Sequence, residues 1–253
     1  MRPIYEETFT VKAEDCDAFG RLKPSALLHY VQEVSGNHAQ MLGAGWDQLQ
    51  EKKLFWAIIR HRVSMTRLPA AGEVITLQTH PMPTSRVAYP RATTALDKKG
   101  NVLFRSHALW VLMDIESRAM ILPGKSGVPV EGVLLGNELE TPGSLSPKEL
   151  SQCATRLVTA EDLDQNRHVN NARYLDWLEA LLDEGFRKEH TMTEFSVCYL
   201  SEALLDQQIQ LRWELSEEGI LTADAHRQST DVHGKNDRIF AARLHFSQCS
   251  VNQ

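Results

Sequence analysis

The sequence carries the same motif twice. Residues 11–17 are VKAEDCD and residues 158–164 are VTAEDLD, with five identities in seven positions at an offset of 147 residues (158 − 11). The register continues beyond the motif, where Tyr30 falls opposite Trp177 and Val31 opposite Leu178. A repeat of this kind indicates two tandem copies of one structural unit, so the fold must be one that forms twice within the chain.

The length of the chain agrees with two copies. The 253 residues allow about 125 for each copy, which is enough to bury a core of its own. Residues 123–147 hold nine of the chain's 24 glycines and prolines, as is typical of a connecting segment. We therefore place the boundary near residue 140, with an N-terminal unit over residues 1–140 and a C-terminal unit over residues 141–253.

Each copy begins with a strand pattern that changes to a helix pattern. Phe9 and Val11 alternate with polar residues before the first motif, as in a half-buried strand. Apolar residues then recur at helical spacing. In the first copy they are Leu27, Val31 and Val34, ending near Gly43, and in the second they are Tyr174, Leu178, Leu181 and Leu182, ending at Gly185. A glycine is a common residue just past a helix end.

Four further strands are expected after each helix. The apolar and β-branched stretches are 56–66, 73–80, 86–96 and 102–113 in the first copy and 194–200, 207–215, 220–227 and 238–247 in the second. Residues 99–101 (Lys-Gly-Asn) predict a hairpin turn. One strand, a long helix and four strands predict an α+β unit whose antiparallel sheet wraps around the helix.

Composition excludes several classes of protein. A net charge of −6 argues against a broad nucleic-acid surface, and no window reaches the ~18 apolar residues of a membrane span. The first ten residues, MRPIYEETFT, lack the apolar core of a signal peptide. The four cysteines form no CxxC pair and are expected to be reduced thiols. We expect a cytoplasmic protein.

Polar residues gather in front of the second helix. In an extended chain Asp164, Asn166 and His168 project to the same side. Together with a helix N-terminus they could position a water and stabilise an oxyanion, as carbonyl hydrolysis requires. The alternative is that the acid and the amide only cap the helix and the histidine is an ordinary polar residue. Neither HExxH nor paired Cys/His spacing occurs, so no metal or cofactor is expected.

Comparison of the copies favours the catalytic interpretation. The first copy has Phe19 and Arg21 in place of Asn166 and His168, although Asp17 is kept. A structural cap should persist in both copies. Loss of the polar pair alone indicates duplication followed by decay of one site.

Residues 162–180, DLDQNRHVNNARYLDWLEA, resemble the DxNxHVNNxxYxxW signature of the plant and bacterial fatty acyl-ACP thioesterases, where ACP is the acyl carrier protein. Residues 55–79 and 108–123 look like the N-terminal half of that family. The resemblance implies a tandem double hotdog that hydrolyses fatty acyl-ACP in fatty acid biosynthesis. It implies that Asp164, Asn166 and His168 are catalytic, with Glu202 as a fourth residue. The first copy has Leu68 at the position of Glu202.

One departure from the family bears on the mechanism. Many members carry a cysteine directly after the fourth catalytic residue, and this chain has Ala203 there. We therefore expect direct attack by water, with Glu202 or Asp164 as the general base. His168 and a backbone N–H near Asn170 would stabilise the oxyanion, and Asn166 would orient a neighbour. Which acid takes the proton is left open.

A fatty acyl chain needs an apolar tunnel. We expect Leu27, Val31, Val34 and Trp56 of the first copy to line it, although each could equally be plain core. Because carrier proteins are acidic, Arg167 and Arg173 are candidates for contact with the carrier.

An acyl-CoA thioesterase on the same fold and a non-catalytic acyl-binding module remain as alternatives, although the intact Asp164, Asn166, His168 and Glu202 argue against the second. Acyl chain length and assembly, including a homodimer, are left open.

Overall fold

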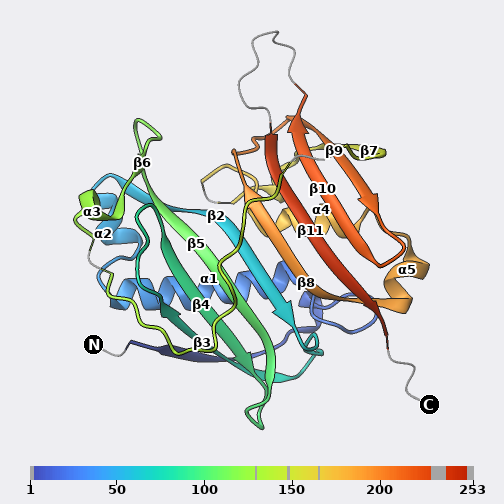
Figure 1. Cartoon of the computed structure of the whole chain (residues 1–253), viewed down its shortest axis with the longest axis horizontal. Coiled ribbons are helices and arrows are strands. Elements are labelled where there is room, and N and C mark those ends of the chain that lie inside the picture. Colours follow the sequence, from blue (N-terminus) through green and yellow to red (C-terminus); the bar gives the residue numbers. More distant parts are fainter. Residues whose placement is uncertain (1–2, 129, 147–148, 165, 229–237, 250–253) are drawn as a thin grey trace. The chain divides into compact units, whose positions relative to one another are not determined.

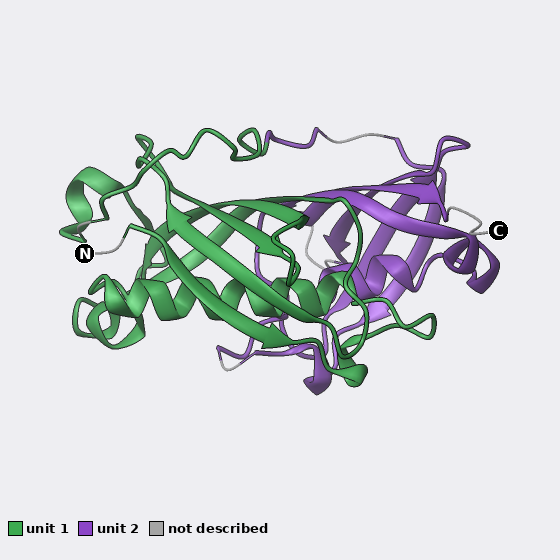
Figure 2. Cartoon of the chain, turned by 90° about the horizontal axis from the view of Figure 1, so that it is seen from below, with its two compact units in different colours: residues 1–142 green, residues 143–253 purple. Residues whose placement is uncertain are grey.

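The chain forms two compact units, unit 1 (residues 1–142) and unit 2 (residues 143–253), distinguished by colour in Figure 2. The computed structural model describes residues 3–128, 130–146, 149–164, 166–228 and 238–249. Two prolines of the expected connecting segment, Pro129 and Pro147, lie outside the described residues. Within the described part of the chain, no helix has the length and apolar character needed to cross a membrane.

Unit 1 contains a five-stranded antiparallel sheet in the order β1-β3-β4-β5-β2 (Figure 1). The strands are β1 (Tyr5–Thr10), β2 (Leu54–Met65), β3 (Val74–Pro81), β4 (Tyr89–Leu96) and β5 (Val102–Asp114), and the short β6 (Met120–Ile121) pairs with β5. The predicted turn at residues 99–101 joins β4 to β5. There the Gly100 N–H donates to the Asp97 carbonyl oxygen, with a φ of 82° that suits glycine.

The central helix of unit 1 is α1 (Pro24–Met41), which begins with a proline in its first turn. Leu27, Leu28 and Val34 on this helix have no exposed surface, and Val31 retains 3%. The helix packs against the sheet at β1 and β3. A one-turn helix (Ala13–Asp15) precedes it, α2 (Trp46–Glu51) follows it, and α3 (Pro123–Ser126) follows β6.

Unit 2 repeats this arrangement in equivalent elements. Its strands are β7 (Gln152–Leu157), β8 (His190–Tyr199), β9 (Gln208–Leu215), β10 (Ile220–Arg227) and β11 (Arg238–Gln248), paired in the order β7-β9-β10-β11-β8. Phe195, Phe240 and Leu175 are fully buried in its core. A one-turn helix (Ala160–Asp162) again precedes the central helix, α4 (Arg173–Glu179), and α5 (Glu184–Glu189) follows.

The predicted end of the second central helix is wrong. α4 ends at Glu179, and Gly185 lies inside α5 and does not terminate a helix. The carboxylate of Asp183 accepts a hydrogen bond from the Phe186 N–H at 2.8 Å, which starts a new helix at Glu184. The apolar period continues through Leu182 because this residue is also buried, beyond the end of α4.

Residues 133–142 of the connecting segment lie against the face of the unit 1 sheet that points away from α1 (Figure 1). The Val133 N–H donates to the Pro81 carbonyl oxygen at 3.0 Å, and the Glu138 carboxylate lies 3.1 Å from Nε2 of His80. Gly132 lies so close to the chain just after β3 that an added Cβ would clash with the Met82 backbone. Burial under this segment lowers the pKa of His80, against the opposing effect of Glu138.

Candidate active site

Asp164, Asn166 and His168, three of the four residues expected to be catalytic, lie on a tight turn and not on an extended strand. The Asp164 N–H donates to the His168 carbonyl oxygen at 2.8 Å, and the Arg167 N–H donates to the Asp164 carbonyl oxygen at 3.0 Å. Leu163 and Val169 pair as an antiparallel bridge, so the chain reverses direction between them. The expectation of side chains projecting from alternate positions is therefore wrong. The chain reversal brings Asp164 and His168, the two ends of the turn, next to each other.

Asp164 holds this turn through its side chain. Its Oδ1 accepts hydrogen bonds from the backbone N–H groups of Asn166 at 2.8 Å and of His168 at 3.4 Å. Asp17 does the same in unit 1, where its Oδ1 accepts from Phe19 and Arg21, both at 2.9 Å. Side-chain acceptance of this kind is the usual way in which aspartate stabilises a turn. The acid therefore has a structural function in both units.

His168 and Glu202 come together from separate parts of unit 2. The imidazole Nε2 of His168 lies 3.3 Å from Oε2 of Glu202, and the side chains are 22% and 45% exposed. Two backbone contacts position them, because the Val169 N–H donates to the Ala203 carbonyl oxygen at 2.9 Å and His168 bridges Leu204. The pair is thus fixed by its backbone and reachable from solvent. Asn166 is exposed beside it on the turn.

The equivalent positions of unit 1 form a different contact. The guanidinium of Arg21 donates from Nε to Oδ2 of Asp17 at 2.9 Å, and it lies 4.7 Å from the ring centre of Phe19. Leu68 occupies the position of Glu202. Arg21 therefore satisfies the second oxygen of the turn aspartate, and no histidine–carboxylate pair can form among these residues.

Asn170 supports the local backbone. Its N–H donates to the Asp162 carbonyl oxygen at 2.9 Å, and its Oδ1 accepts from the Ala172 N–H at 2.9 Å. The Arg173 N–H in turn donates to the Asn170 carbonyl oxygen at 2.9 Å. These bonds occupy the N–H groups of Asn170 and Ala172, and a backbone N–H near Asn170 as an oxyanion donor stays a prediction.

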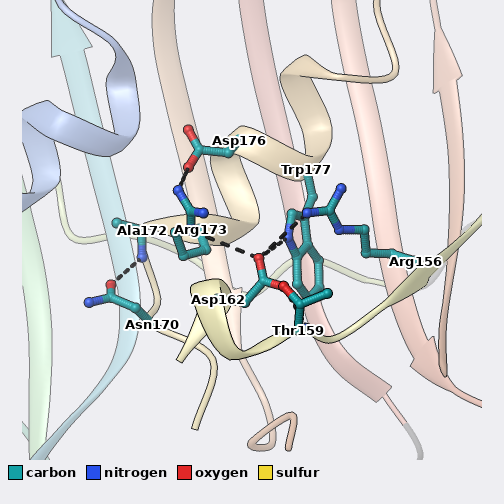
Figure 3. A network of polar contacts seen from close by, with 8 residues as sticks. All are labelled: Arg156, Thr159, Asp162, Asn170, Ala172, Arg173, Asp176 and Trp177. Carbon is teal, nitrogen blue, oxygen red and sulfur yellow. Dashed lines mark hydrogen bonds and ion pairs between the residues drawn. The ribbon is translucent and has the colours of Figure 1, made fainter. Parts of the chain in front are cut away.

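The sequence interpretation did not single out Asp162, which joins the turn to α4 (Figure 3). This carboxylate is 1% exposed and accepts from the Trp177 indole N–H at 3.0 Å and from Thr159 at 2.9 Å. Arg156 and Arg173 lie 3.6 and 3.8 Å from it. Burial opposes ionisation, but the hydrogen bonds outweigh it and lower the pKa of Asp162.

The same link occurs in unit 1. Tyr30 donates to Oδ2 of Asp15 at 2.6 Å, and the Lys23 N–H donates to the Asp15 carbonyl oxygen at 2.9 Å. Burial, followed by this hydrogen bond, raises the pKa of Tyr30 to about 12. The repeated Ala-Glu-Asp of the motif was the available signal, since its aspartate is identical in both copies and pairs with an aromatic residue of the following helix.

The four residues expected to line an acyl tunnel all lie in unit 1. Leu27, Val31 and Val34 are buried on α1, and Trp56 is half-buried on β2. The Trp56 indole N–H donates to the Ala44 carbonyl oxygen at 2.8 Å, and its ring meets Tyr89 edge-on. Contact of these residues with an acyl chain stays a prediction.

The interior of unit 1 is more polar than a plain acyl tunnel would require. His38 on α1 is 1% exposed, and its Nδ1 lies 3.2 Å from Nη1 of Arg91, which also donates to Thr79 at 3.3 Å. Burial lowers the pKa of Arg91 to about 10. His61, also 1% exposed, shares a 2.7 Å hydrogen bond with Ser106, and burial lowers its pKa to about 3. The sequence pattern of α1 gave no indication of this group.

The cysteines do not form part of the histidine–glutamate site. All four are free thiols. Cys198 is 4% exposed and its Sγ contacts the Gly143 carbonyl oxygen at 3.5 Å. Ala203, which follows Glu202, is fully buried. The position where the family resemblance leads us to expect a thiol is here filled by a methyl group in the core.

In each unit an antiparallel sheet packs against a central helix, and the second unit repeats the turn, the strand order and the aspartate that accepts from an aromatic residue of the central helix. These features define a double hotdog protein, with a histidine–glutamate pair beside the turn of the second hotdog and with Arg21 and Leu68 at the equivalent positions of the first. The chain belongs to the acyl-ACP thioesterase family: residues 2–122 match the acyl-ACP thioesterase N-terminal domain and residues 146–246 match the C-terminal domain.

Individual relatives are distant in sequence. A dodecanoyl-[acyl-carrier-protein] hydrolase of Cinnamomum camphora is 22% identical over 82% of this chain and 58% of its own length. An oleoyl-acyl carrier protein thioesterase of Arabidopsis thaliana is 24% identical over 96% of this chain and 72% of its own length. Both are chloroplastic proteins. The chain thus spans little more than half the length of the first of these relatives.

Solved structures share the fold across the whole chain. An acyl-ACP thioesterase from Bacteroides thetaiotaomicron superposes with a TM-score of 0.80 at 20% identity, covering 97% of this chain and 98% of that one. The 12:0-ACP thioesterase from Umbellularia californica gives 0.81 at 19% identity, covering 98% and 99%.

Proposed function

We propose that this chain hydrolyses the thioester of a fatty acyl-ACP and releases the free fatty acid and ACP. The observation that carries the proposal is the 3.3 Å contact between His168 and Glu202, which has no equivalent in unit 1. Membership of the acyl-ACP thioesterase family supports it. The reaction needs water and no cofactor.

The geometry supports Glu202 as the general base. The carboxylate and the imidazole are close enough to contact the same water, and catalytic contacts are often looser before substrate binds. Water would add to the thioester carbonyl carbon while one of its protons passes to Glu202. The tetrahedral intermediate would then lose the thiolate as the C–S bond breaks, and the proton would pass to the sulfur. His168 would donate a hydrogen bond to the oxyanion.

Asp164 fits a positioning role better than that of a base. Its Oδ1 accepts from two N–H groups of its own turn. Asp17 makes the same bonds in unit 1, which has Arg21 and Leu68 at the positions of His168 and Glu202. Because the turn aspartate is present in unit 1, where the other catalytic residues are absent, its common function in both units is to hold the fold. Asp164 would act by holding His168 against Glu202, and the exposed Asn166 would orient the water.

We assign different tasks to the two units. Unit 2 carries the reacting groups, and unit 1 receives the acyl chain, with Leu27, Val31, Val34 and Trp56 as its candidate contacts. Burial of these apolar side chains around α1 supports the assignment. Cytoplasmic location stays a prediction from the sequence, and assembly, including a homodimer, stays open.

The decisive experiment is a turnover assay with detection of the released thiol. The substrates are acyl-ACPs of increasing chain length and the acyl-CoAs with the same chains. Faster hydrolysis of acyl-ACP supports the proposal, whereas a preference for acyl-CoA would reassign the carrier. Binding of acyl-ACP without release of thiol would make the chain an acyl-binding module.

A further inference from the structure

The loop that carries Glu202 exposes three leucines. Leu200, Leu204 and Leu205 are 42%, 41% and 47% exposed, and all three lie within three residues of Glu202. The base of the loop is fixed, because the Leu200 and Ser201 N–H groups both donate to the Ile239 carbonyl oxygen. The loop thus presents three apolar side chains to solvent within six residues, and exposed apolar surface of this kind is a feature of interaction sites.

Unit 1 contains the same loop and provides an internal comparison. The offset after the helices is 134 residues, so loop 66–73 corresponds to loop 200–207 (200 − 66). Three hydrogen bonds recur at equivalent positions. The Gly72 N–H donates to the Val11 carbonyl oxygen, as the Asp206 N–H does to that of Val158. The Glu73 N–H donates to the Ala70 carbonyl oxygen, as the Gln207 N–H does to that of Leu204. The Ala70 N–H donates to the Glu73 carboxylate, as the Leu204 N–H does to the Gln207 side-chain oxygen. The two loops therefore share one backbone.

The shared backbone separates what the fold requires from what it does not. Where unit 2 has the three leucines, unit 1 has Thr66, Ala70 and Ala71, which are also exposed. Small side chains thus suffice to form this loop. The leucines occur only in the unit that carries the histidine–glutamate pair, so their apolar surface serves that site and not the loop.

Cationic groups lie beside the leucines. The guanidinium of Arg227 donates to the Glu202 carbonyl oxygen at 2.7 Å and to the Gln207 side chain at 3.1 Å, which ties it to the loop. Arg167 is exposed on the adjacent turn, which bridges the loop through His168 and Leu204. Arg173, the other cation expected to meet a carrier, is instead engaged by Asp176 at 2.8 Å and lies near Asp162.

We propose that Leu200, Leu204 and Leu205, here named the leucine rim, dock the acyl carrier protein beside Glu202, with Arg167 and Arg227 meeting its acidic surface. The inference rests on the proposed function. A chain of net charge −6 does not attract an acidic carrier at long range. Affinity must then come from local contact, and an apolar patch flanked by cations supplies both apolar burial and charge complementarity.

The test transfers the side chains of unit 1 into unit 2. The triple variant Leu200→Thr, Leu204→Ala, Leu205→Ala gives loop 200–207 residues that this chain already accommodates on the same backbone. Each enzyme is assayed on one acyl chain carried either by ACP or by N-acetylcysteamine, which has the thioester but no protein. We expect the variant to lose at least about tenfold in kcat/KM on acyl-ACP, through KM, and to keep its kcat/KM on the small thioester.

The control variant Leu134→Ala, Leu135→Ala removes two other exposed leucines, at 65% and 48% exposure, and should change neither value. An equal loss on both substrates would overturn the docking proposal, because the leucines would then contact the acyl or pantetheine part. Unchanged kinetics on acyl-ACP would overturn it as well, as would a change in oligomeric state on sedimentation, which would assign the rim to a second copy. If the unmodified enzyme hydrolyses neither substrate, the proposed function fails.

Discussion

The imidazole of His168 faces the carboxylate of Glu202 at 3.3 Å, and the residues at the same two positions of unit 1, Arg21 and Leu68, make no such pair. Arg21 turns instead to the aspartate of its own turn, Asp17. One backbone therefore supports two different sets of side-chain contacts. The difference between them predicts which substitutions abolish activity and which only affect stability.

Replacing His168 by alanine should lower kcat at least about 100-fold while the protein stays folded, because a polarising group is lost from the reaction. Steady-state kinetics on acyl-ACP, with circular dichroism to verify the fold, would measure this. Arg21→Ala is the matched control, since it removes the side chain at the same position of unit 1. Turnover of His168→Ala near that of the unmodified enzyme would contradict the assignment.

Replacing each acid by its amide should identify the general base. Asp164→Asn keeps an oxygen able to accept the N–H groups of Asn166 and His168, so we expect kcat to fall by less than about tenfold. Glu202→Gln removes the proton acceptor, and we expect a loss of about 100-fold or more. Kinetics of the two variants on one acyl-ACP decide between them. The reverse order of losses would make Asp164 the base.

Enlarging α1 should shorten the accepted acyl chain if unit 1 measures it. Each methylene excluded from an apolar pocket forfeits about 0.8 kcal/mol, so Val31→Phe and Val34→Phe should shift kcat/KM several-fold toward shorter acyl-ACPs. Both valines are buried, and overpacking should also cost about 1–3 kcal/mol of stability. Thermal unfolding measures that loss. Equal loss of activity at every chain length would show that these residues are only core.

Acid should destabilise unit 1 through His61. Its pKa is about 3 in the folded protein and about 6.5 when unfolded. Between these values the unfolded chain binds one more proton, so stability is lost as pH falls through this range, by up to about 1.4 kcal/mol per pH unit. Denaturant unfolding between pH 7 and pH 4.5 should show a shallower dependence for His61→Gln. The same substitution at the exposed His29 should leave the dependence unchanged.

The strands could be predicted closely because the repeat supplied each of them twice. Expected stretches 73–80 and 207–215 fall within one residue of β3 and β9. Two starts were wrong, because β8 begins at His190, four residues before the expected 194–200, and β4 begins at Tyr89, three residues into the expected 86–96. The end of α4 could not be predicted, because apolar spacing continues through Leu182 while the helix stops at Glu179. Periodicity reports which residues are buried and does not report whether the backbone between them remains helical.

The geometry of the candidate site could not be predicted from the sequence, and the catalytic roles of its residues stay predictions. The sequence placed Asp164 and His168 together as neighbours on an extended chain, whereas a turn in which Arg167 has a φ of 64° joins them. The counterpart of Arg167 in unit 1 is Gly20, with a φ of 77°, and glycine is the residue that signals such a turn. The polar interior around His38 and Arg91 was not predicted, because it comes from α1 and β4, which are far apart in sequence.

The shared turn also bears on how such a protein can change. Asp17 and Asp164 each hold the same chain reversal by accepting from the backbone N–H groups two and four residues further on. Because these bonds involve no side chain of the donating residues, the side chains after each aspartate can be exchanged while the turn keeps its backbone conformation. A duplicated enzyme can then lose the catalytic side chains of one of its two units at little cost to folding. It follows that the same side chains can be put back into that unit. Phe19→Asn, Arg21→His and Leu68→Glu, made together, would place a second pair like His168–Glu202 on a turn and a loop whose backbones match those of unit 2.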